Sequence, residues 1–378
     1  MTNVVIAGYN RSAFTLANKG ALSRTRPDDI VATVIKALLE KSKAKPEDVE
    51  DLIMGCAFPE AEQGLNIGRH AVFLAGLSNS TAGQTVNRFC GSSMQSIHMA
   101  AGAIKMGAGE VFICAGIESM SRIPIPGFNP MPNPALTNAG HHAYVSMGET
   151  AENLAEKYKI QRAEQEKFAL QSHMRAARAQ ADGKFKDEII PVEGFSSKVD
   201  IDGCIRRDTT ADGLAELKPA FKEKGTVTAG TSSPLTDGAS AVLVCSEDYA
   251  HKNNMKPLAR IVSIAVSGCA PEIMGIGPVE ATNKALSRAK LKLDQIDIIE
   301  LNEAFAAQAL SVVHDLGISL SKTNIDGGAI ALGHPLGASG ARITGKAASL
   351  LQREQKKYAL AAMCIGGGQG IATVLEAL

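Results

Sequence analysis

Apolar and polar positions follow two different periods along this chain, and these periods predict helices that alternate with buried strands. Residues 28–41 place apolar side chains three and four positions apart, which predicts a helix with one buried face. Residues 4–8 and 110–116 are short apolar runs that predict buried strands, and residues 92–106 predict a second helix. Strands and helices in this alternation predict an α/β architecture with a mostly parallel sheet.

The same order of elements returns in the last third of the chain. Residues 280–290 predict a helix. Residues 293–302 and 358–366 resemble residues 46–55 and 110–116 in their patterns. The separation within each pair is on the order of 250 residues, far longer than the period of about 20–50 residues that is typical of solenoids. Two similar α/β halves explain this pattern, and chance likeness between common α/β units is the alternative.

A different kind of sequence separates the two halves. Residues 121–140 are rich in Pro and Asn and predict an extended loop, residues 149–180 predict a charged helical stretch, and residues 184–225 are polar and irregular. An apolar run at 236–246 then predicts a strand that returns to the first half. We therefore divide the chain into a first half at 1–117, completed by 236–257, an inserted and mainly helical loop domain at 118–235, and a second half at 258–378.

Composition narrows the classes of function. Of the 378 residues, 45% are hydrophobic, which allows a large core, and Lys+Arg and Asp+Glu number 39 each. This balance gives no global attraction to nucleic acid or to an anionic membrane, and no apolar window of about 18 residues predicts a membrane span. The seven cysteines are scattered without a C-x-x-C pair, which argues against a disulfide framework and a zinc site. Together with the lack of a signal-peptide pattern, they favour the reducing cytoplasm.

Three glycine-rich segments, far apart in the chain, carry the candidate chemistry. Cys90 lies in N-R-F-C-G-S-S-M, His334 lies in G-G-A-I-A-L-G-H-P-L-G-A-S-G, and Cys364 lies in M-C-I-G-G-G-Q-G. A thiolate nucleophile needs a base to form it and backbone N–H groups to hold the oxyanion that it creates. Glycine allows a substrate to approach the main chain. The three segments together predict acyl transfer through a cysteine thioester.

Each candidate residue has a structural alternative. Cys90 precedes a predicted helix whose N-terminus favours a thiolate, whereas free cysteines are commonly buried and inert, as expected for Cys114 and Cys245 on apolar strands. The glycines after Cys364 offer bare N–H groups to an oxyanion or form only a turn. Asn302 follows a predicted strand, where it either faces a ligand or caps the next helix.

Two nucleotide-binding patterns are near misses. Residues 340–347 almost match a P-loop, but Ala347 stands where a Ser or Thr is required to bind Mg²⁺. The glycines after Cys364 fail the G-x-G-x-x-G pattern because Ile371 occupies the last glycine position.

His334 lies in a Gly/Pro turn after an apolar run, which suits a base better than a solvated surface histidine.

Seven ordered segments resemble the thiolase family over essentially the whole chain, and most closely its degradative branch. They are V-N-R-F-C-G-S-S-M-Q, S-M-G-E-T-A-E-N-L-A, V-T-A-G-T-S-S-P-L-T-D-G, I-M-G-I-G-P-V, N-E-A-F-A-A-Q, G-G-A-I-A-L-G-H-P-L-G-A-S-G-A-R and C-I-G-G-G-Q-G. The resemblance implies a five-layered αβαβα fold of two similar halves with a loop domain that holds coenzyme A. It also implies CoA-dependent thiolytic cleavage of 3-ketoacyl-CoA to acetyl-CoA and a shortened acyl-CoA, as in fatty acid β-oxidation, with the Claisen condensation as its reverse.

The resemblance assigns roles residue by residue. Cys90 matches the acylated nucleophile, His334 the base that activates it, and Cys364 the second acid/base. Asn302 matches the residue that positions a water in the first oxyanion hole, and the N–H groups of Cys90 and Gly366 match the second. Four further residues match positions along the pantetheine path, namely Met147, Ala229, Gly230 and Ser233.

The resemblance also implies the partners of the chain. CoA, acetyl-CoA and 3-ketoacyl-CoA are expected as substrates and products, with no tightly bound cofactor and no metal. A homodimer or homotetramer is typical of the family, and some degradative members associate with a hydratase/dehydrogenase subunit.

Two positions depart from the family pattern. Ser146 stands where acetoacetyl-CoA-specific relatives carry His, which favours the broader enzyme over an acetoacetyl-CoA thiolase. Asp326 stands where Asn is usual, which is expected to alter the hydrogen bonding behind His334. A condensing ketosynthase, which relies on Cys-His-His or Cys-His-Asn, and a non-catalytic acyl-CoA-binding protein are the other classes weighed. The second Cys argues against the former, and the three intact reactive groups argue against the latter.

Overall fold

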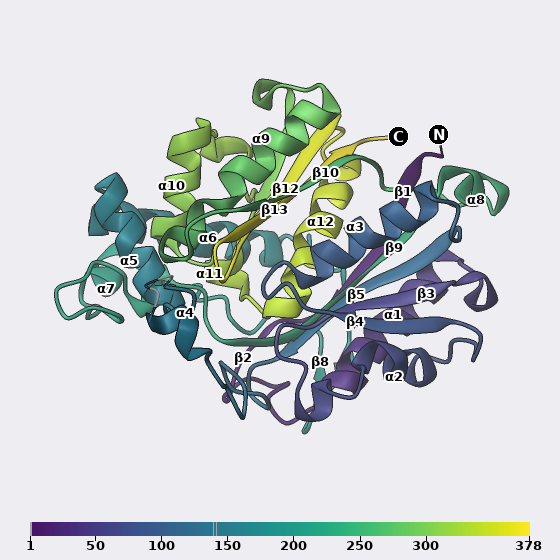
Figure 1. Cartoon of the computed structure of the whole chain (residues 1–378), viewed down its shortest axis with the longest axis horizontal. Helices are drawn as coiled ribbons and strands as arrows, with labels where there is room; N and C mark the ends of the chain where they lie inside the picture. The colour runs from purple at the N-terminus through teal and green to yellow at the C-terminus, as the bar shows by residue number, and fades with distance from the viewer. Residues whose placement is uncertain (1, 139, 141) are drawn as a thin grey trace.

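The computed structural model describes residues 2–138, 140 and 142–378. Its main sheet is mixed and has eleven strands (Figure 1). The order of its main strands is β11-β12-β13-β10-β1-β9-β5-β3-β4. The first-half strands are β1 (Val4–Ser12), β2 (Thr15–Leu16), β3 (Asp51–Gly55), β4 (Ala82–Val86), β5 (Val111–Ser119) and β9 (Thr236–Ser246). The second-half strands are β10 (Ala259–Gly268), β11 (Ile298–Leu301), β12 (Tyr358–Ile365) and β13 (Gln369–Glu376).

Helices cover both faces of this sheet. Those of the first half are α1 (Pro27–Ser42), α2 (Ile67–Leu74), α3 (Ser92–Lys105) and α8 (Glu247–Lys252), with the 3₁₀ turns η1 (Pro46–Asp48) and η2 (Ala61–Gln63). Those of the second half are α9 (Gly277–Ala289), α10 (Ala306–Leu316), α11 (Ala329–Leu332) and α12 (Leu336–Arg353), with η4 (Pro271–Ile276), η5 (Leu293–Gln295) and η6 (Leu320–Lys322). The predicted helices at 28–41, 92–106 and 280–290 are therefore present within a few residues of their expected ends.

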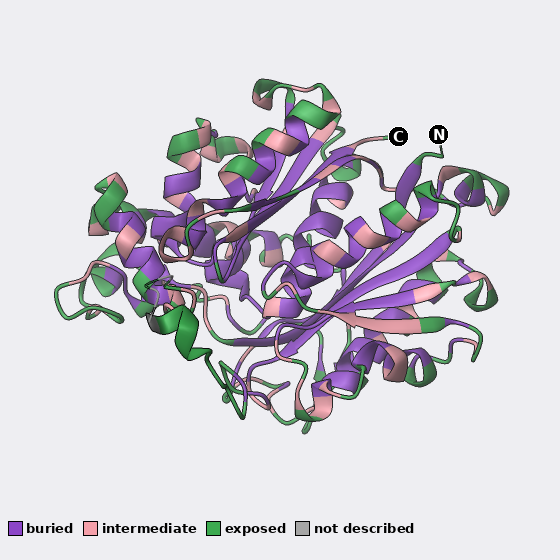
Figure 2. Cartoon of the chain, viewed as in Figure 1, coloured by how far each residue is buried: buried purple, intermediate pink, exposed green. Residues whose placement is uncertain are grey.

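The helices α3 and α12 form a central layer between the two halves of the sheet. Helix α12 packs against α3, against β1, β5 and β9 of the first half, and against β11 and β12 of the second. Helices α1 and α2 contact the first half of the sheet, and α9 contacts β10, β12 and β13 of the second half. This arrangement gives the five layers expected from the sequence. Figure 2 shows the strands and the central helices largely buried, with exposed residues gathered on outer helices and loops.

Small residues let the two central helices approach each other closely. A methyl group placed on Gly340 of α12 would lie 2.3 Å from the backbone nitrogen of Met94 on α3, a separation that real side chains do not reach. The Ser93 hydroxyl accepts a hydrogen bond of 2.8 Å from the backbone N–H of Ala341. The glycine-rich composition of G-A-S-G-A-R thus fixes the contact between the first turns of α3 and α12.

The sheet is not mostly parallel, so that prediction was wrong. Strands β3–β4, β3–β5 and β11–β12 pair parallel, as do β1 and the short β6, while the other main pairs are antiparallel. Strand β9 returns from the insertion to lie antiparallel between β5 and β1, and β12 and β13 form a hairpin. Buried strands of either direction have similar apolar patterns, and direction depends on how the connecting segments return.

The two halves repeat one another in order and direction. In the first half, β5 pairs parallel with β3 and antiparallel with β9, and in the second half β12 pairs parallel with β11 and antiparallel with β13. A central helix precedes β5 and β12 alike, namely α3 and α12. The counterpart of β4 is reduced to one parallel bridge between Ile299 and Thr323. The structure therefore supports a true repeat over chance likeness.

The inserted segment between β5 and β9 is mainly helical among its described residues. It contains α4 (Pro134–Asn138), α5 (Met147–Tyr158), α6 (Arg162–Ala181), β6 (Ile189–Ile190), β7 (Val192–Glu193), β8 (Lys198–Val199), α7 (Ala211–Ala215) and η3 (Ala229–Thr231). Strand β5 continues to Ser119, two residues past the expected end of the first half at 117. The short helix α4 lies within the stretch that Pro and Asn content predicted to be a loop, because Pro134 stands at a helix start, where its fixed φ is tolerated.

A buried chain of ion pairs joins the inserted segment to both halves. Arg11 of β1 pairs with Glu188 (2.9 Å) and with Asp202 (2.7 Å), both from the insertion. Lys346 of α12 pairs with Glu188 (3.0 Å) and with Asp326 (2.8 Å), and all of these side chains are at most 8% exposed. Arg353 adds a two-pronged contact of 2.6 and 2.9 Å to Asp326.

We predict that replacing Asp326 by Asn lowers the free energy of unfolding by about 3–5 kcal/mol, because it removes one partner from a buried ion pair. Burial by itself raises the pKa of Asp326, but hydrogen bonds and charge from Arg353 and Lys346 outweigh burial and hold the pKa below its usual value. The stabilisation is therefore complete near neutral pH and is lost as the pH falls through the folded-state pKa of this carboxyl.

Urea unfolding of the D326N variant at neutral pH measures this loss. The matched control is Arg178→Ala, which removes an exposed ion pair of 3.8 Å with Asp182 and is expected to change stability by less than about 0.5 kcal/mol. Equal, small effects of the two substitutions would contradict the stabilising role of the buried chain.

Candidate active site

Cys90 lies in a tight loop between β4 and the first residue of α3. The Ser92 hydroxyl donates to the carbonyl of Phe89 (2.6 Å) and accepts from the N–H of Arg88 (2.9 Å), and Asn87 Oδ1 accepts from the N–H of Phe89 (2.9 Å). Phe89 takes a positive φ of 41°, which is uncommon for a residue with a side chain. These bonds hold the loop, so that Cys90 is presented just before the helix.

The Cys90 thiol is buried, with only 8% of the residue exposed. Burial raises the pKa of the thiol to about 11, while the backbone N–H groups of Gly366 and of Cys90 itself stabilise the thiolate and act in the opposite direction. The N–H of Cys90, just before α3, therefore favours the thiolate as expected, but desolvation is the larger effect and the resting sulfur is a thiol. A base must remove the proton before the sulfur can act as a nucleophile.

His334 is fixed in the turn before α12 by its neighbours. Gly333 takes a positive φ of 101°, and the N–H of His334 donates to Thr236 Oγ1 (3.0 Å). The imidazole Nδ1 lies 2.5 Å from Ser339 Oγ, and that hydroxyl donates its proton to the carbonyl of Pro335 (2.9 Å). Because the hydroxyl has one proton, Nδ1 must donate to it, which leaves Nε2 unprotonated.

Burial, with a smaller effect of the positive charge of Arg342, lowers the pKa of His334 to about 3. The ring is therefore neutral near neutral pH, and its free Nε2 lone pair can accept a proton. Neutral imidazole with a fixed tautomer is the state that a general base requires.

The carboxylate of Glu118 anchors the turn that holds His334. Glu118 is the last residue but one of the buried strand β5, and it accepts hydrogen bonds from the N–H groups of Ala57 (2.8 Å) and Gly337 (2.8 Å) and from Gln63 Nε2 (2.8 Å). Burial raises the pKa of this carboxyl, and the three donors act against that shift. Glu118 thus ties the loop after β3 to the start of α12.

Cys364 lies near the end of β12, immediately before the glycine turn. It is 1% exposed and packs among apolar residues that include Met147 and Phe305. Burial raises the pKa of the Cys364 thiol well above its usual value, and the neighbouring Cys90 sulfur raises it further. That electrostatic coupling and the contact of the Gly366 N–H with the Cys90 sulfur place the two cysteines in one site.

Asn302 follows β11 and points its side chain at His334. Its Nδ2 lies 3.4 Å from His334 Nε2, which fits an amide donor facing the free lone pair, while its Oδ1 is buried without a partner among the described residues. Asn302 does not cap α10, because the residue that precedes that helix is Phe305. The capping alternative is therefore wrong.

Asn324 and Glu303 fix the backbone on either side of Asn302. Asn324 brackets Leu301 with two hydrogen bonds, from its Nδ2 to the carbonyl (2.8 Å) and from the N–H to its Oδ1 (2.9 Å). Asn324 Nδ2 also donates to Glu303 (2.7 Å), whose other oxygen accepts from Ser172 (2.6 Å) and from the N–H of Ile330 (3.2 Å). The segment that leads to His334 is thereby fixed to the end of β11.

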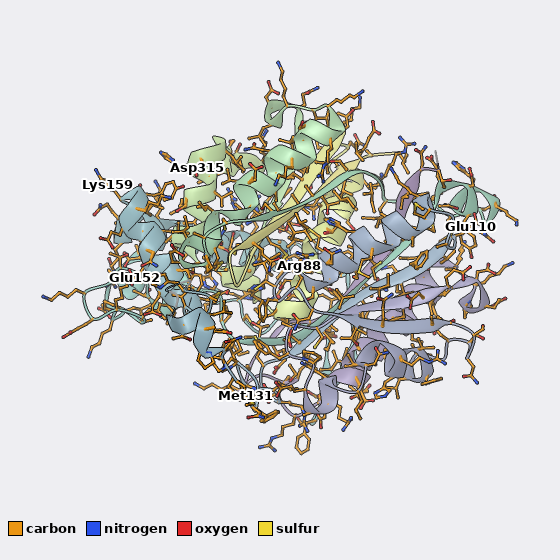
Figure 3. All side chains as sticks on the ribbon, in the orientation of Figure 1. Arg88, Glu110, Met131, Glu152, Lys159 and Asp315 are labelled. Atoms are coloured by element: carbon orange, nitrogen blue, oxygen red, sulfur yellow. The ribbon has the colours of Figure 1, made fainter. Side chains whose placement is uncertain are left out.

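The candidate residues of the three glycine-rich segments thus converge. The backbone N–H of Asn302 donates to the carbonyl of Ala362 (3.0 Å) on β12, next to Met363 and Cys364, and the helices that follow Cys90 and His334 are packed together. Figure 3 labels Arg88, two residues before Cys90, near the middle of the molecule beside the start of α3. Cys90, Cys364 and Gly366 accordingly lie together, and His334 and Asn302 face each other where α12 packs on β11 and β12.

Of the residues expected along the pantetheine path, Met147 lies beside Gly366 and Ser233 is bonded to the segment that follows Asn302. Met147 begins α5, and its sulfur would be 3.4 Å from a methyl group placed on Gly366. Ala229 and Gly230 form η3, and the N–H of Ser233 donates to the carbonyl of Ala304 (3.0 Å). Ser146 caps α5, since its hydroxyl and Glu149 bond reciprocally.

Several residues that support the site were not found by sequence reasoning. Ser339, Thr236 and Glu118 orient His334, and Asn324 orients Asn302, yet none received a role from the sequence. A polar residue at the end of an apolar strand was the available signal for Glu118. Ser339 lies inside the quoted His334 motif, but only the fold shows that its hydroxyl faces the ring.

The remaining cysteines fit a structural role. All seven cysteines are described and free, and Cys114 and Cys245 are buried on β5 and β9 as expected. Within the described ranges, no group of three or more His, Cys, Asp or Glu side chains is arranged to hold a metal ion. Of the helices in the described part of the chain, none has the length and apolar character to cross a membrane.

Two family models match nearly the whole chain. Residues 4–248 match the thiolase N-terminal domain, and residues 255–377 match the thiolase C-terminal domain. The chain is 45% identical to the 3-ketoacyl-CoA thiolase of Bacillus subtilis, with 100% of each chain covered. It is 48% identical to the acetyl-CoA acetyltransferase of Chromobacterium violaceum, with 94% of this chain and 95% of that protein covered.

One solved structure also matches the whole chain. The crystal structure of human mitochondrial 3-ketoacyl-CoA thiolase in complex with CoA matches with a TM-score of 0.92 at 42% identity, and it covers 100% of this chain and 98% of that chain. The chain therefore belongs to the thiolase family of acyltransferases.

Proposed function

We propose that this thiolase-family chain is a 3-ketoacyl-CoA thiolase, which uses CoA to cleave a 3-ketoacyl-CoA into acetyl-CoA and a shortened acyl-CoA. Two observations carry the proposal: the Cys90 sulfur lies against the N–H of Gly366 beside Cys364, and a buried, neutral His334 turns a free Nε2 toward Asn302. One nucleophile, two proton-transfer groups and two sets of oxyanion donors are what this carbon–carbon cleavage requires.

Cys90 begins the reaction after its proton moves to Nε2 of His334. The thiolate attacks the 3-keto carbon of the substrate, and the carbonyl oxygen becomes an oxyanion. The N–H groups of Cys90 and Gly366, which stabilise the resting sulfur, are the donors proposed for this oxyanion. A donor in a comparable oxyanion hole contributes about 3 kcal/mol of transition-state stabilisation.

Collapse of the tetrahedral species breaks the bond between carbons 2 and 3. The electron pair passes to carbon 2 of the departing acetyl-CoA and delocalises onto its thioester oxygen. His334, now protonated at Nε2, and a water held by the unpartnered Oδ1 of Asn302 are the donors proposed for that oxygen. Cys364 gives its thiol proton to carbon 2, so acetyl-CoA leaves and the shortened acyl group remains on Cys90.

A molecule of CoA then completes the cycle. The Cys364 thiolate takes the thiol proton of CoA, and the CoA sulfur attacks the acyl thioester on Cys90. The acyl-CoA leaves, and the Cys90 thiolate recovers the proton that His334 holds. Met147, Ala229, Gly230 and Ser233 are proposed to line the pantetheine path, because Met147 approaches Gly366 and the segment after η3 is bonded to Ala304, which belongs to the same apolar cluster as Cys364 and Met147.

The decisive experiment measures CoA-dependent loss of the 3-ketoacyl-CoA enolate absorbance for acetoacetyl-CoA and for 3-ketooctanoyl-CoA. We expect both substrates to be cleaved, because Ser146 is engaged with Glu149 as a helix cap and the His of short-chain specialists is absent. Cleavage of acetoacetyl-CoA alone would support the acetoacetyl-CoA thiolase instead. Binding of acyl-CoA without cleavage of either substrate would reject both enzymes.

We also propose that the chain forms a homo-oligomer through the free edge of β4. Strand β4 ends the sheet, and large apolar side chains are exposed on and beside α2, which packs on it, namely Leu65 (87%), Phe73 (51%) and Leu74 (49%). An exposed strand edge beside apolar side chains favours pairing with a second copy. Analytical ultracentrifugation that shows only monomers at micromolar concentration would contradict this.

The free cysteines and reactive thiols favour a reducing setting such as the cytoplasm.

A further inference from the structure

Phe89 is an unusual residue to stand next to a buried nucleophile. Its side chain and backbone are 39% exposed, although phenylalanine is large and apolar, and the neighbouring Cys90 is only 8% exposed. Its φ of 41° lies in the left-handed region, which residues with side chains seldom adopt. The fold therefore holds an aromatic ring in a strained backbone position, without burying it in the core.

The surrounding hydrogen bonds maintain this conformation. The N–H of Phe89 donates to Asn87 Oδ1 (2.9 Å), and its carbonyl accepts from the Ser92 hydroxyl (2.6 Å) and from the N–H of Ser92 (3.1 Å). All of these bonds use the main chain of Phe89, so another residue could make them. Strain that the surroundings maintain in this way is typical of functional sites.

The ring of Phe89 lies beside Gly366, the residue whose N–H contacts the Cys90 sulfur. A methyl group placed on Gly366 would be 3.8 Å from Phe89 Cδ2 and 3.4 Å from Met147 Sδ, and the N–H of Gly366 acts on the Cys90 sulfur. The centroid of the Phe58 ring lies 6.1 Å from that of the Phe89 ring, and the two ring planes meet at 45°, so the aromatic surface extends beyond Phe89. An apolar wall thus begins at the nucleophile and continues outward.

We propose that Phe89 is a specificity-determining residue that provides the apolar surface on which the acyl chain of the substrate lies. This inference rests on the proposed thiolase function. The exposed ring gains contact with each methylene that reaches it, so longer chains benefit more than the methyl group of acetoacetyl-CoA. The strained backbone directs the ring toward the acyl group, where an extended backbone would direct it elsewhere.

The test compares kcat/KM for 3-ketooctanoyl-CoA with kcat/KM for acetoacetyl-CoA. In the Phe89→Gly variant, we expect the ratio of the two to fall about tenfold, since a few apolar contacts discriminate substrates by about this factor. Glycine adopts the positive φ without strain, so the loss of the ring does not threaten folding. Phe89→Leu restores an apolar side chain and is expected to recover most of the ratio.

A control variant tests whether the change in the ratio is specific to Phe89. Phe195→Ala removes another exposed ring from the insertion. This ring is 71% exposed and packs on Arg24, and its loss should leave the ratio unchanged. A parallel fall for both substrates in the Phe89→Gly variant, or a ratio within about twofold of the original, overturns the specificity role. If the unaltered protein cleaves neither substrate, the proposed function itself fails and this inference fails with it.

Discussion

The Cys90→Ala variant will lose CoA-dependent cleavage of 3-ketoacyl-CoA to the background rate, a fall of about 10⁶-fold, as expected when the residue that forms the covalent intermediate is removed. The oxyanion donors and His334 remain in this variant, but no other described thiol has the same contact with the N–H of Gly366. The measurement is the decay of enolate absorbance at saturating CoA, paired with mass spectrometry of the protein after exposure to an acyl-CoA. The variant should show no acyl adduct.

A matched control separates loss of the nucleophile from damage to the fold. Cys114→Ala removes a fully buried thiol from β5, in the same half of the molecule, and is expected to leave turnover within about threefold of the unaltered protein. Undiminished turnover by the Cys90 variant would reject the assignment of the nucleophile. An acyl adduct on a different cysteine would reject it as well.

The Cys364→Ala variant will separate the two halves of the reaction. We expect overall cleavage to fall by about 10³-fold, within the range for loss of a general acid/base. Cys90 keeps its base, so an acyl-CoA should still acylate it slowly, with CoA leaving as an unprotonated thiolate, and the return transfer to CoA should be slow as well because no group deprotonates the incoming thiol. Intact-protein mass spectrometry should show one acyl group on Cys90, and stopped-flow absorbance should show slow release.

Cys269→Ala is the control for the second thiol. Cys269 is partly buried, and it is close enough to Cys364 to affect its pKa, but its own sulfur faces the carbonyl of Met274. Its loss is expected to leave both acylation and turnover within about threefold of the unaltered protein. Rapid turnover by the Cys364 variant, or no acyl adduct on Cys90 in that variant, would contradict the proposed role.

The parts of the site that the sequence predicts are those with local signatures. Glycine beside a cysteine or a histidine marks close approach to the main chain, and Cys90, His334 and Cys364 were each identified in this way. The order of helices and buried strands also follows from local periodicity. The directions of β9 and β13 do not: β9 returns antiparallel after the long insertion, and β13 turns back from β12 in a hairpin, so the prediction of a mostly parallel sheet was wrong.

Contacts between residues far apart in the chain have no such signature. Arg11 meets Asp202 across 191 positions, and Asp326 meets Lys346 and Arg353 on a neighbouring helix. Sequence reasoning marked Asp326 as unusual but gave it no partner, and the structure supplies both cations. Likewise, the hydroxyl of Ser339 fixes the tautomer of His334 only because one turn of α12 brings it to the ring.

The correspondence between α3 and α12 has a consequence for the history of the chemistry. Cys90 stands two residues before α3, and His334 stands two residues before α12, so the sulfur and the imidazole occupy matching turns in the two copies of one unit. A duplicated ancestor would have carried the same residue at both turns. Divergence would then have given one copy the nucleophilic cysteine and the other the basic histidine. A fragment that contains a single copy would carry only half of the reactive pair.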